Sequence, residues 1–80
     1  MKTKTVVVRR FPIKLEQFLK FAGACASGGE AKARILQRQV RLNGSVCTQR
    51  GKKIQPGDQI LLDDTLYVSE FDPSQMNLHQ

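Results

Sequence analysis

Tryptophan is absent from this 80-residue chain, and histidine and cysteine are scarce, with one and two copies. The histidine, His79, stands in the polar end of the sequence, and Cys25 and Cys47 are 22 positions apart without a Cys-x-x-Cys pair. This is not the ligand pattern of a zinc site, so we expect no metal. The two cysteines are expected to be small, partly buried thiols rather than a disulfide.

The residue combinations used in catalysis are also missing. There is no Ser-His-Asp or Cys-His set, no Gly-Lys-Ser/Thr of a Walker loop and no G-x-G-x-x-G after a strand. Adjacent acids occur at Asp63 and Asp64, but two aspartates between apolar runs are typical of a turn. We therefore predict a protein that is not an enzyme and that uses no cofactor or small-molecule substrate.

Long apolar segments are lacking, and runs such as Val6–Val8 do not exceed three residues. The sequence therefore offers neither a membrane span nor the apolar core of a signal peptide. A hydrophobic fraction of 40% is typical of a folded chain rather than of a disordered one. We predict one small cytoplasmic domain with a thin core.

Basic residues are absent from positions 54–80, which hold five acids, whereas residues 1–53 carry all 13 lysines and arginines against two acids. The overall charge of +6 therefore conceals a basic body with a net charge of +11. This segregation favours a polyanionic partner over a surface that is merely kept soluble by lysine. An anionic membrane is disfavoured, because no basic stretch also carries a broad apolar stripe.

Two helices are predicted in the first half of the chain. Between Lys14 and Ala22, apolar residues recur at helical spacing. Ser27 and Glu30 form a capping-box pattern, in which the hydroxyl accepts from the Glu30 amide and the carboxylate reaches back to the Ser27 amide. The second helix therefore starts at Ser27, and it is expected to stop near Arg38.

The other elements are strands joined by turns with clear sequence signals. The signals are Asn43-Gly44 for a two-residue hairpin, Pro56-Gly57 at the centre of a type II turn, and Asp63-Asp64. The hairpin pairs Val40 with Cys47, which places Cys47 on the core side. The expected strands are Thr5–Val8, Val40–Leu42, Ser45–Thr48, Ile60–Leu62 and Leu66–Phe71. The predicted fold class is α+β, with two N-terminal helices packed on a small, largely antiparallel β-sheet and acids exposed on its back.

Two groups of cations are candidate contacts for the polyanion. They are Lys32, Arg34, Arg38 and Arg41 in and after the second helix, and Arg50, Lys52 and Lys53 in a later loop. In the first group, Arg34 and Arg38 stand four residues apart on the helix and repel each other, and an external anion would relieve this repulsion; the alternative is a solvated helix face. The loop either contacts a nucleic-acid backbone or is mobile and kept soluble by its charge, and we favour the contact.

The pair Gly28-Gly29 lies in the first turn of the second helix, where each glycine weakens the helix by up to ~1 kcal/mol relative to alanine. One explanation is that a phosphate can approach the free amides of the helix N-terminus where no side chain stands. A tight start of the helix or close helix packing explains the pair equally well, and both alternatives stay open.

Several short motifs occur in a fixed order: Lys14-Leu15-Glu16, Ala26-Ser27-x-x-Glu30-Ala31, Val40-x-Leu42-Asn43-Gly44 and Lys53-Ile54-x-Pro56-Gly57-Asp58. Their order and spacing over residues 13 to 68 resemble the S-four-type RNA-binding domain, the αL RNA-binding motif first known from the fourth protein of the small ribosomal subunit. The stretches 27–32 and 50–53 are similar to the small stand-alone YaaA/YbcJ-like members of that family, in which the domain is nearly the whole protein.

The resemblance implies structured RNA bound along the second helix, the start of the first helix and neighbouring loops. Carried over by position, the residues on or beside that surface are Lys14, Ser27, Lys32, Arg41, Asn43, Lys52 and Lys53. Many relatives have Arg or Lys after the cap serine where this chain has two glycines, which shifts weight onto backbone amides and Lys32. Many also have glycine at the position of Arg38, so here the helix exit differs or Arg38 adds a phosphate contact.

The resulting prediction is a monomeric, non-enzymatic RNA-binding protein that docks on ribosomal or transfer RNA, with the ribosomal subunit as a candidate partner. Because few aromatic side chains are available for stacking, we expect recognition by shape and phosphate. The alternatives are a protein-interaction module with an acidic or ribosomal partner and a general DNA binder. The expected domains are a basic arm or short strand at 1–12, the RNA-binding domain at 13–71 and a flexible polar tail at 72–80.

Overall fold

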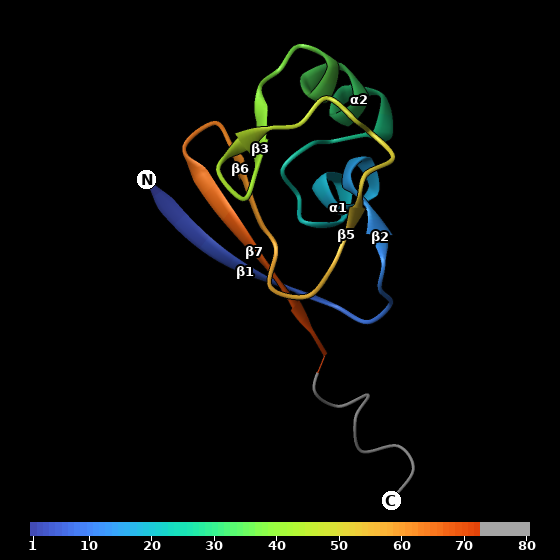
Figure 1. The fold of residues 1–80 in the computed structure, drawn as a ribbon, viewed down its shortest axis with the longest axis vertical. Helices are drawn as coiled ribbons and strands as arrows, with labels where there is room; N and C mark the ends of the chain where they lie inside the picture. Colours follow the sequence, from blue (N-terminus) through green and yellow to red (C-terminus); the bar gives the residue numbers. More distant parts are fainter. Residues whose placement is uncertain (73–80) are drawn as a thin grey trace, which may run out of the picture.

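The computed structural model describes residues 1–72, which form two helices, a five-stranded sheet and a separate two-stranded ribbon (Figure 1). Of the tail predicted at 72–80, Asp72 is described, and its amide donates to the Val8 carbonyl oxygen at 3.1 Å. Residues 73–80, with His79, lie outside the described part. The helices are α1 (Leu15–Phe21) and α2 (Gly28–Leu36), and the ribbon pairs β2 (Ile13–Lys14) with β5 (Lys53–Ile54). The five-stranded sheet contains β1 (Lys2–Val8), β7 (Thr65–Phe71), β6 (Gln59–Leu62), β3 (Val40–Leu42) and β4 (Ser45–Val46), in that spatial order.

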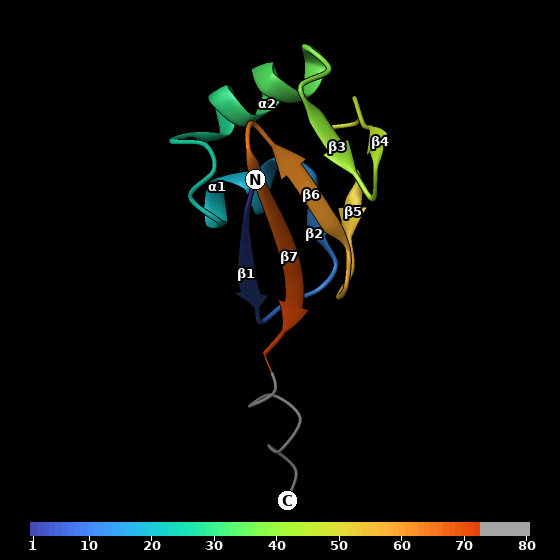
Figure 2. The ribbon, with the colours of Figure 1, turned by 90° about the vertical axis from the view of Figure 1, so that its left-hand side faces the viewer.

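The predicted α+β class is confirmed, but two details of the predicted architecture are wrong. Strand β1 precedes both helices, so the helices are not N-terminal. It also pairs in parallel with β7, from Lys2 opposite Thr65 to Val8 opposite Phe71, which makes the sheet mixed (Figure 2). The remaining strand pairs are antiparallel, as expected. A β-branched run indicates a strand but does not specify its partner, and no turn signal connects two strands at opposite ends of the domain.

Both helices lie on one side of the five-stranded sheet (Figure 1). The hydrophobic core is made of buried residues from both layers. Strand residues alternate between the two faces of a sheet, so every second residue of a strand meets the helices. The buried apolar residues of the five-stranded sheet are Val6 and Val8 in β1, Ile60 and Leu62 in β6, and Val40 in β3, and Ser69 in β7 is buried as well. The buried helix residues include Leu15, Phe18 and Leu19 in α1 and Ala31 and Ile35 in α2. The apolar spacing that predicted α1 is therefore the spacing of its buried face.

The two turns with the clearest sequence signals are confirmed. Asn43 and Gly44 have φ angles of 51° and 89°, and Leu42 pairs with Ser45 across them, as a two-residue hairpin requires. Gly57 has a φ of 92°, and the Asp58 amide donates to the Gln55 carbonyl oxygen at 3.1 Å, as in a type II turn. Within residues 1–72, neither helix is long and apolar enough to cross a membrane.

Candidate nucleic-acid interface

The two-stranded ribbon brings together cations that are far apart in the sequence. Lys14 of β2 lies directly opposite Lys53 of β5, and both side chains are exposed, whereas Ile54 beside Lys53 is completely buried. Like charges opposite each other in a ladder repel by a few tenths of a kcal/mol. The buried isoleucine holds the strand in place beneath α1, so the two lysines stay adjacent despite this repulsion.

The basic loop before β5 is anchored by its backbone to the start of α1. The Leu15 amide donates to the Lys52 carbonyl oxygen at 2.8 Å, and the Glu16 amide donates to the Arg50 carbonyl oxygen at 3.1 Å. Lys14, the N-cap residue, supplies no side-chain cap, so these carbonyls satisfy amides that the first turn of any helix leaves without an intrahelical partner. The loop is therefore fixed to α1, unlike the mobile loop considered as the alternative.

We define the basic cluster as the four cations Lys14, Arg50, Lys52 and Lys53. They surround the N-terminus of α1, which carries the partial positive charge of the helix dipole and so adds to the positive potential. Among residues 1–72, no acidic side chain forms an ion pair with any of the four, because the ion pairs involve the N-terminus, Arg9 and Arg34. The cluster is therefore a group of exposed positive charges on an anchored backbone, without an ion-pair partner among residues 1–72, and the nearby acid is Glu16 in the first turn of α1.

The start of α2 is the second candidate contact region, and it carries the acid Glu30 in its first turn. The Ser27 hydroxyl accepts from the Glu30 amide at 3.1 Å, as predicted, but the Glu30 carboxylate accepts from the Ala26 amide at 2.8 Å rather than from Ser27. A Cβ atom built on Gly28 would have no neighbour within 4 Å, and one on Gly29 would meet only the Ser27 hydroxyl at 3.8 Å. Close packing within the domain therefore does not require these glycines, and the space in front of the helix is open.

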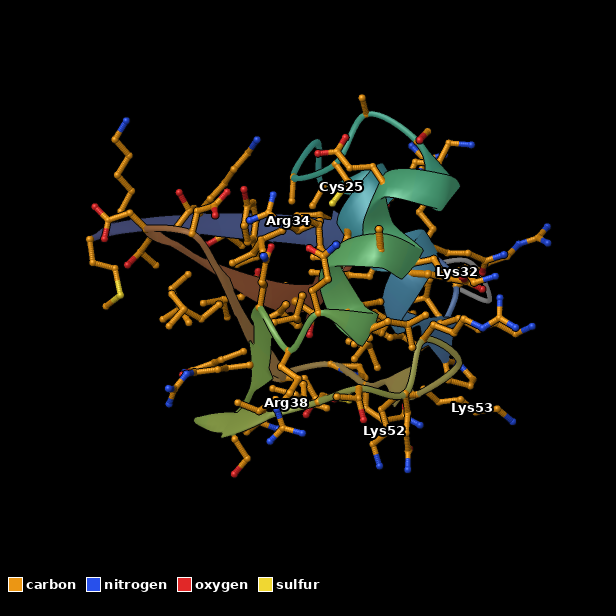
Figure 3. All side chains as sticks on the ribbon, turned by 90° about the horizontal axis from the view of Figure 1, so that it is seen from above. Cys25, Lys32, Arg34, Arg38, Lys52 and Lys53 are labelled. Carbon is orange, nitrogen blue, oxygen red and sulfur yellow. The ribbon has the colours of Figure 1, made fainter. Side chains whose placement is uncertain are left out.

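Lys32 and Arg34 point in different directions, although both lie on α2. Two residues turn an α-helix by about 200°, so the two side chains leave opposite faces. Figure 3 shows Lys32 on the same flank of the molecule as Lys52 and Lys53, with Arg34 on the other side of α2, next to the five-stranded sheet. Lys32 can therefore extend the surface of the basic cluster, and Arg34 cannot.

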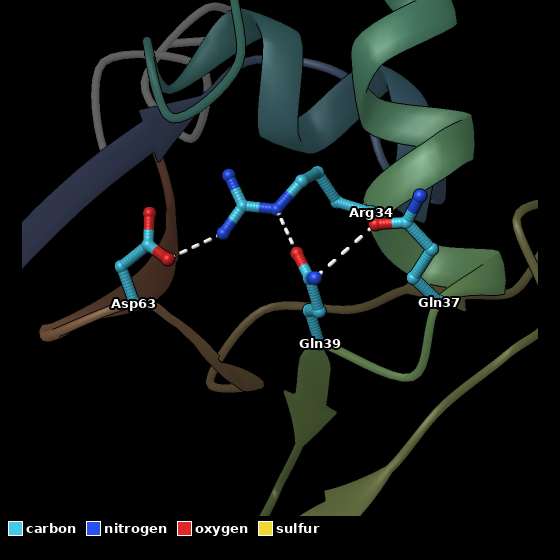
Figure 4. A network of polar contacts seen from close by, with 4 residues as sticks. All are labelled: Arg34, Gln37, Gln39 and Asp63. Atoms are coloured by element: carbon cyan, nitrogen blue, oxygen red, sulfur yellow. Dashed lines mark hydrogen bonds and ion pairs between the residues drawn. The ribbon is translucent and has the colours of Figure 1, made fainter.

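Arg34 is neutralised inside the fold. Its guanidinium donates to the Asp63 carboxylate in the turn between β6 and β7 and to the Gln39 side-chain oxygen, and Gln39 in turn donates to Gln37 (Figure 4). The Arg34 side chain is 22% exposed. The prediction that the acids of the second half lie apart on the back of the sheet is therefore wrong for Asp63, because the chain bends round to place this turn beside α2.

Arg38 occupies an unusual backbone position just after α2. Its φ angle is 64°, and its amide donates to the Ile35 carbonyl oxygen at 3.0 Å while the Gln39 amide donates to the Arg34 carbonyl oxygen at 3.1 Å. These two bonds form the Schellman motif, in which the residue of left-handed conformation is usually glycine. The helix stop predicted near Arg38 is confirmed, and the arginine there is exposed.

Two further candidate residues, Arg41 and Asn43, do not contribute to the basic cluster. Arg41 alternates with Val40 and Leu42, which face the core, so it projects from the sheet face that the helices do not cover. Asn43 donates from its side chain to the Asp58 carboxylate at 3.1 Å and accepts from the Gln59 amide at 2.9 Å. Asn43 therefore links two turns of the protein with its own amide group.

The two cysteines are free thiols in different surroundings. Cys25 is buried in the core, and this burial, together with the negative charge of Glu30, raises the pKa of its thiol. Cys47 is half-buried against the core, close to the predicted core position. In the described part of the chain, no group of histidine, cysteine, aspartate or glutamate residues could hold a metal ion.

The amino-acid sequence matches a known family. The family model of the S4 domain, which describes its sequences, matches residues 6–68 of the chain. The chain belongs to the S4 domain family. S4 domains are non-catalytic domains that generally bind RNA, and this is the family that the sequence motifs resemble. The matched range contains both helices, the basic loop and the strands β2 to β6. It also includes parts of β1 and β7.

A curated relative is the tyrosine–tRNA ligase of Ralstonia nicotianae, with 38% identity over 50 residues. The aligned residues make up 62% of this chain but only 13% of the ligase. The similarity is therefore confined to the S4 region of a much longer enzyme, and the activity of that enzyme is not transferred to this chain.

Proposed function

We propose that this S4 domain binds structured RNA, of the ribosomal or transfer class, through the basic cluster and the adjoining start of α2. The observation that carries the proposal is the cross-strand pair Lys14 and Lys53, flanked by Arg50 and Lys52, whose carbonyls are bonded to α1. Among residues 1–72, no acidic side chain forms an ion pair with these four cations, and an RNA backbone would supply the neutralising negative charge. Because the loop backbone is already anchored, little backbone conformational entropy is lost when the phosphates bind.

The proposed surface is narrower than the full set of candidate residues. It contains the basic cluster, Lys32, the Gly28-Gly29 backbone with its cap Ser27, and Arg38 at the exit of α2. Arg34 and Asn43 are left out because their side chains are bonded within the fold, and Arg41 because it lies on the other sheet face. The name of the ligase relative supports transfer RNA as one class to test, and the proposed role is binding without catalysis.

The proposal predicts a steep dependence of RNA affinity on salt. If about five cations contact phosphates, the logarithm of the association constant should fall with the logarithm of the salt concentration with a slope of about −4. The measurement is a titration of fluorescently labelled transfer RNA, a ribosomal RNA fragment and a DNA duplex of matched length at several salt concentrations. A slope near zero, or equal affinity for the DNA, would contradict the proposal.

Substitution of the glycines in α2 separates the two explanations for them. Gly28→Ala and Gly29→Ala should each raise the free energy of unfolding by roughly 0.5 kcal/mol, because both sites are open and alanine favours the helix. If a phosphate approaches the amides at this turn, the same variants should weaken RNA binding several-fold, since a methyl group then stands in its path. Ala33→Gly, on the same helix, serves as a control. It should destabilise α2 while leaving the amides of the first turn unobstructed. Stabilised variants with unchanged RNA affinity would show that no phosphate approaches there.

A further inference from the structure

A small hollow of about 290 Å³ opens beside the basic cluster. One wall is the hairpin of β3 and β4, with Leu42, Ser45 and Val46, and the other is the chain that follows, with Cys47, Thr48 and Gln49. Lys52 closes one side. The volume lies just below the roughly 300 to 1,000 Å³ of pockets that hold drug-sized ligands, so the hollow fits one ring system rather than a longer segment.

The lining has the chemical character that a flat heteroaromatic ring requires. Leu42, Val46 and the half-buried Cys47 are the apolar residues of the lining, and Val46 is 39% exposed. Ser45, Thr48 and Gln49, whose side chains carry hydroxyl and amide groups, also line the hollow. Unpaired bases are recognised in this way, with contact on their faces and hydrogen bonds on their edges.

Lys52 connects the hollow to the proposed RNA surface. Lys52 lines the hollow, its carbonyl oxygen accepts from the Leu15 amide at 2.8 Å, and it belongs to the basic cluster. A phosphate bound by the cluster would therefore hold its own nucleotide within reach of the hollow. The larger groove of about 830 Å³, lined by Val7, Pro12 and Phe21 among others, contains no residue of the cluster.

We propose that this hollow receives one unpaired nucleobase of the RNA that the basic cluster binds, so that the domain distinguishes RNA with an extruded base from a continuous duplex. The inference rests on the proposed function. It adds base contact to a surface that otherwise recognises phosphate and shape, and it does so without an aromatic stacking platform.

The test compares three RNA probes with the same stem: a continuous duplex, a duplex with one bulged nucleotide and the same duplex with an abasic bulge. The native protein should bind the bulged duplex about tenfold more tightly than the continuous one, which corresponds to about 1.4 kcal/mol. The abasic probe should lose this preference, because it keeps the kink and the phosphates but lacks the base. Equal affinity for the bulged and abasic probes would overturn the inference.

Chemical modification of Cys47 can block the hollow in the native protein. It leaves the net charge unchanged and requires no substitution that could disturb folding. N-ethylmaleimide should modify Cys47 in the folded protein and leave the buried Cys25, 4% exposed, largely unmodified. The modified protein should lose the preference for the bulge and keep its affinity for the continuous duplex. A Cys47→Ser variant treated in the same way should keep the preference. Retention of the preference after modification, or a Cys47 that does not react, would contradict an open base site.

These results separate the two proposals. Salt-dependent binding of all three probes with no preference for the bulged nucleotide would refute the base site and leave phosphate recognition by the cluster intact. Absence of binding to every probe would refute the proposed function, and the base site with it.

Discussion

Replacement of Lys52 and Lys53 together by glutamate is expected to weaken binding to structured RNA about 100-fold at about 0.1 M salt, which corresponds to ~2.7 kcal/mol. The substitution removes the positive charge of Lys53 opposite Lys14. The two new carboxylates also repel the phosphates that the lysines would attract. Because both side chains are exposed and the loop is held by its backbone, the fold should be preserved. The slope of the salt dependence should become shallower by about 2.

The matched control reverses two lysines outside the proposed surface, Lys2 in β1 and Lys20 at the end of α1. Lys2→Glu/Lys20→Glu changes the net charge by the same amount, and both side chains are exposed. The control should reduce RNA affinity only a few-fold, through the long-range potential. Equal losses in the two double variants would mean that net charge, rather than the basic cluster, determines binding. Circular dichroism and thermal unfolding of each variant would show that the comparison is between folded proteins.

Arg38→Gly is expected to act in opposite directions on stability and on RNA binding. An L-residue other than glycine in the left-handed conformation costs about 1 kcal/mol, and Arg38 has a φ of 64° at the Schellman position of α2. Glycine should therefore raise the free energy of unfolding by about 1 kcal/mol and the Tm by about 4 to 8 °C. The same variant should weaken RNA binding several-fold, because one exposed cation of the proposed surface is lost.

Arg38→Ala separates the two effects. Alanine removes the guanidinium and keeps the backbone cost, so RNA affinity should fall as in the glycine variant while the Tm does not rise. Thermal unfolding and RNA titration of the two variants measure both quantities. A glycine variant that is no more stable than the native protein would mean that other contacts of Arg38 offset its backbone conformation. Unchanged RNA affinity in both variants would remove Arg38 from the proposed surface.

The helices and turns were predictable because the interactions that define them are local. The Ser27 cap joins residues three positions apart, and the Asn43-Gly44 turn joins neighbours that must both adopt positive φ angles. Apolar spacing within seven residues was enough to predict the buried face of α1. The same local rules assigned Arg34 to a basic helix face, and this was misleading, because its partner Asp63 lies 29 residues away.

The candidate site was only partly predictable. The loop cations Arg50, Lys52 and Lys53 were identifiable as a group by their proximity in the sequence. Their position next to Lys14 was implied by family resemblance, but composition and spacing did not indicate it. The ribbon of β2 and β5 has two residues per strand, which is too short to show the alternation that predicts a strand. The hollow beside Lys52 also depends on how the hairpin and the loop fold over each other.

By itself, the sequence determined the two helices, the Ser27 cap of α2, the hairpin turns, the α+β class and a charge distribution that favours a polyanionic partner. Only the tertiary structure decided that β1 pairs in parallel with β7, that Lys14 faces Lys53, and that Arg34 is neutralised by Asp63. The physical reason is the range of the interactions. Caps and turns are set by neighbouring residues, whereas strand partners and ion pairs between elements depend on how the whole chain buries one shared core.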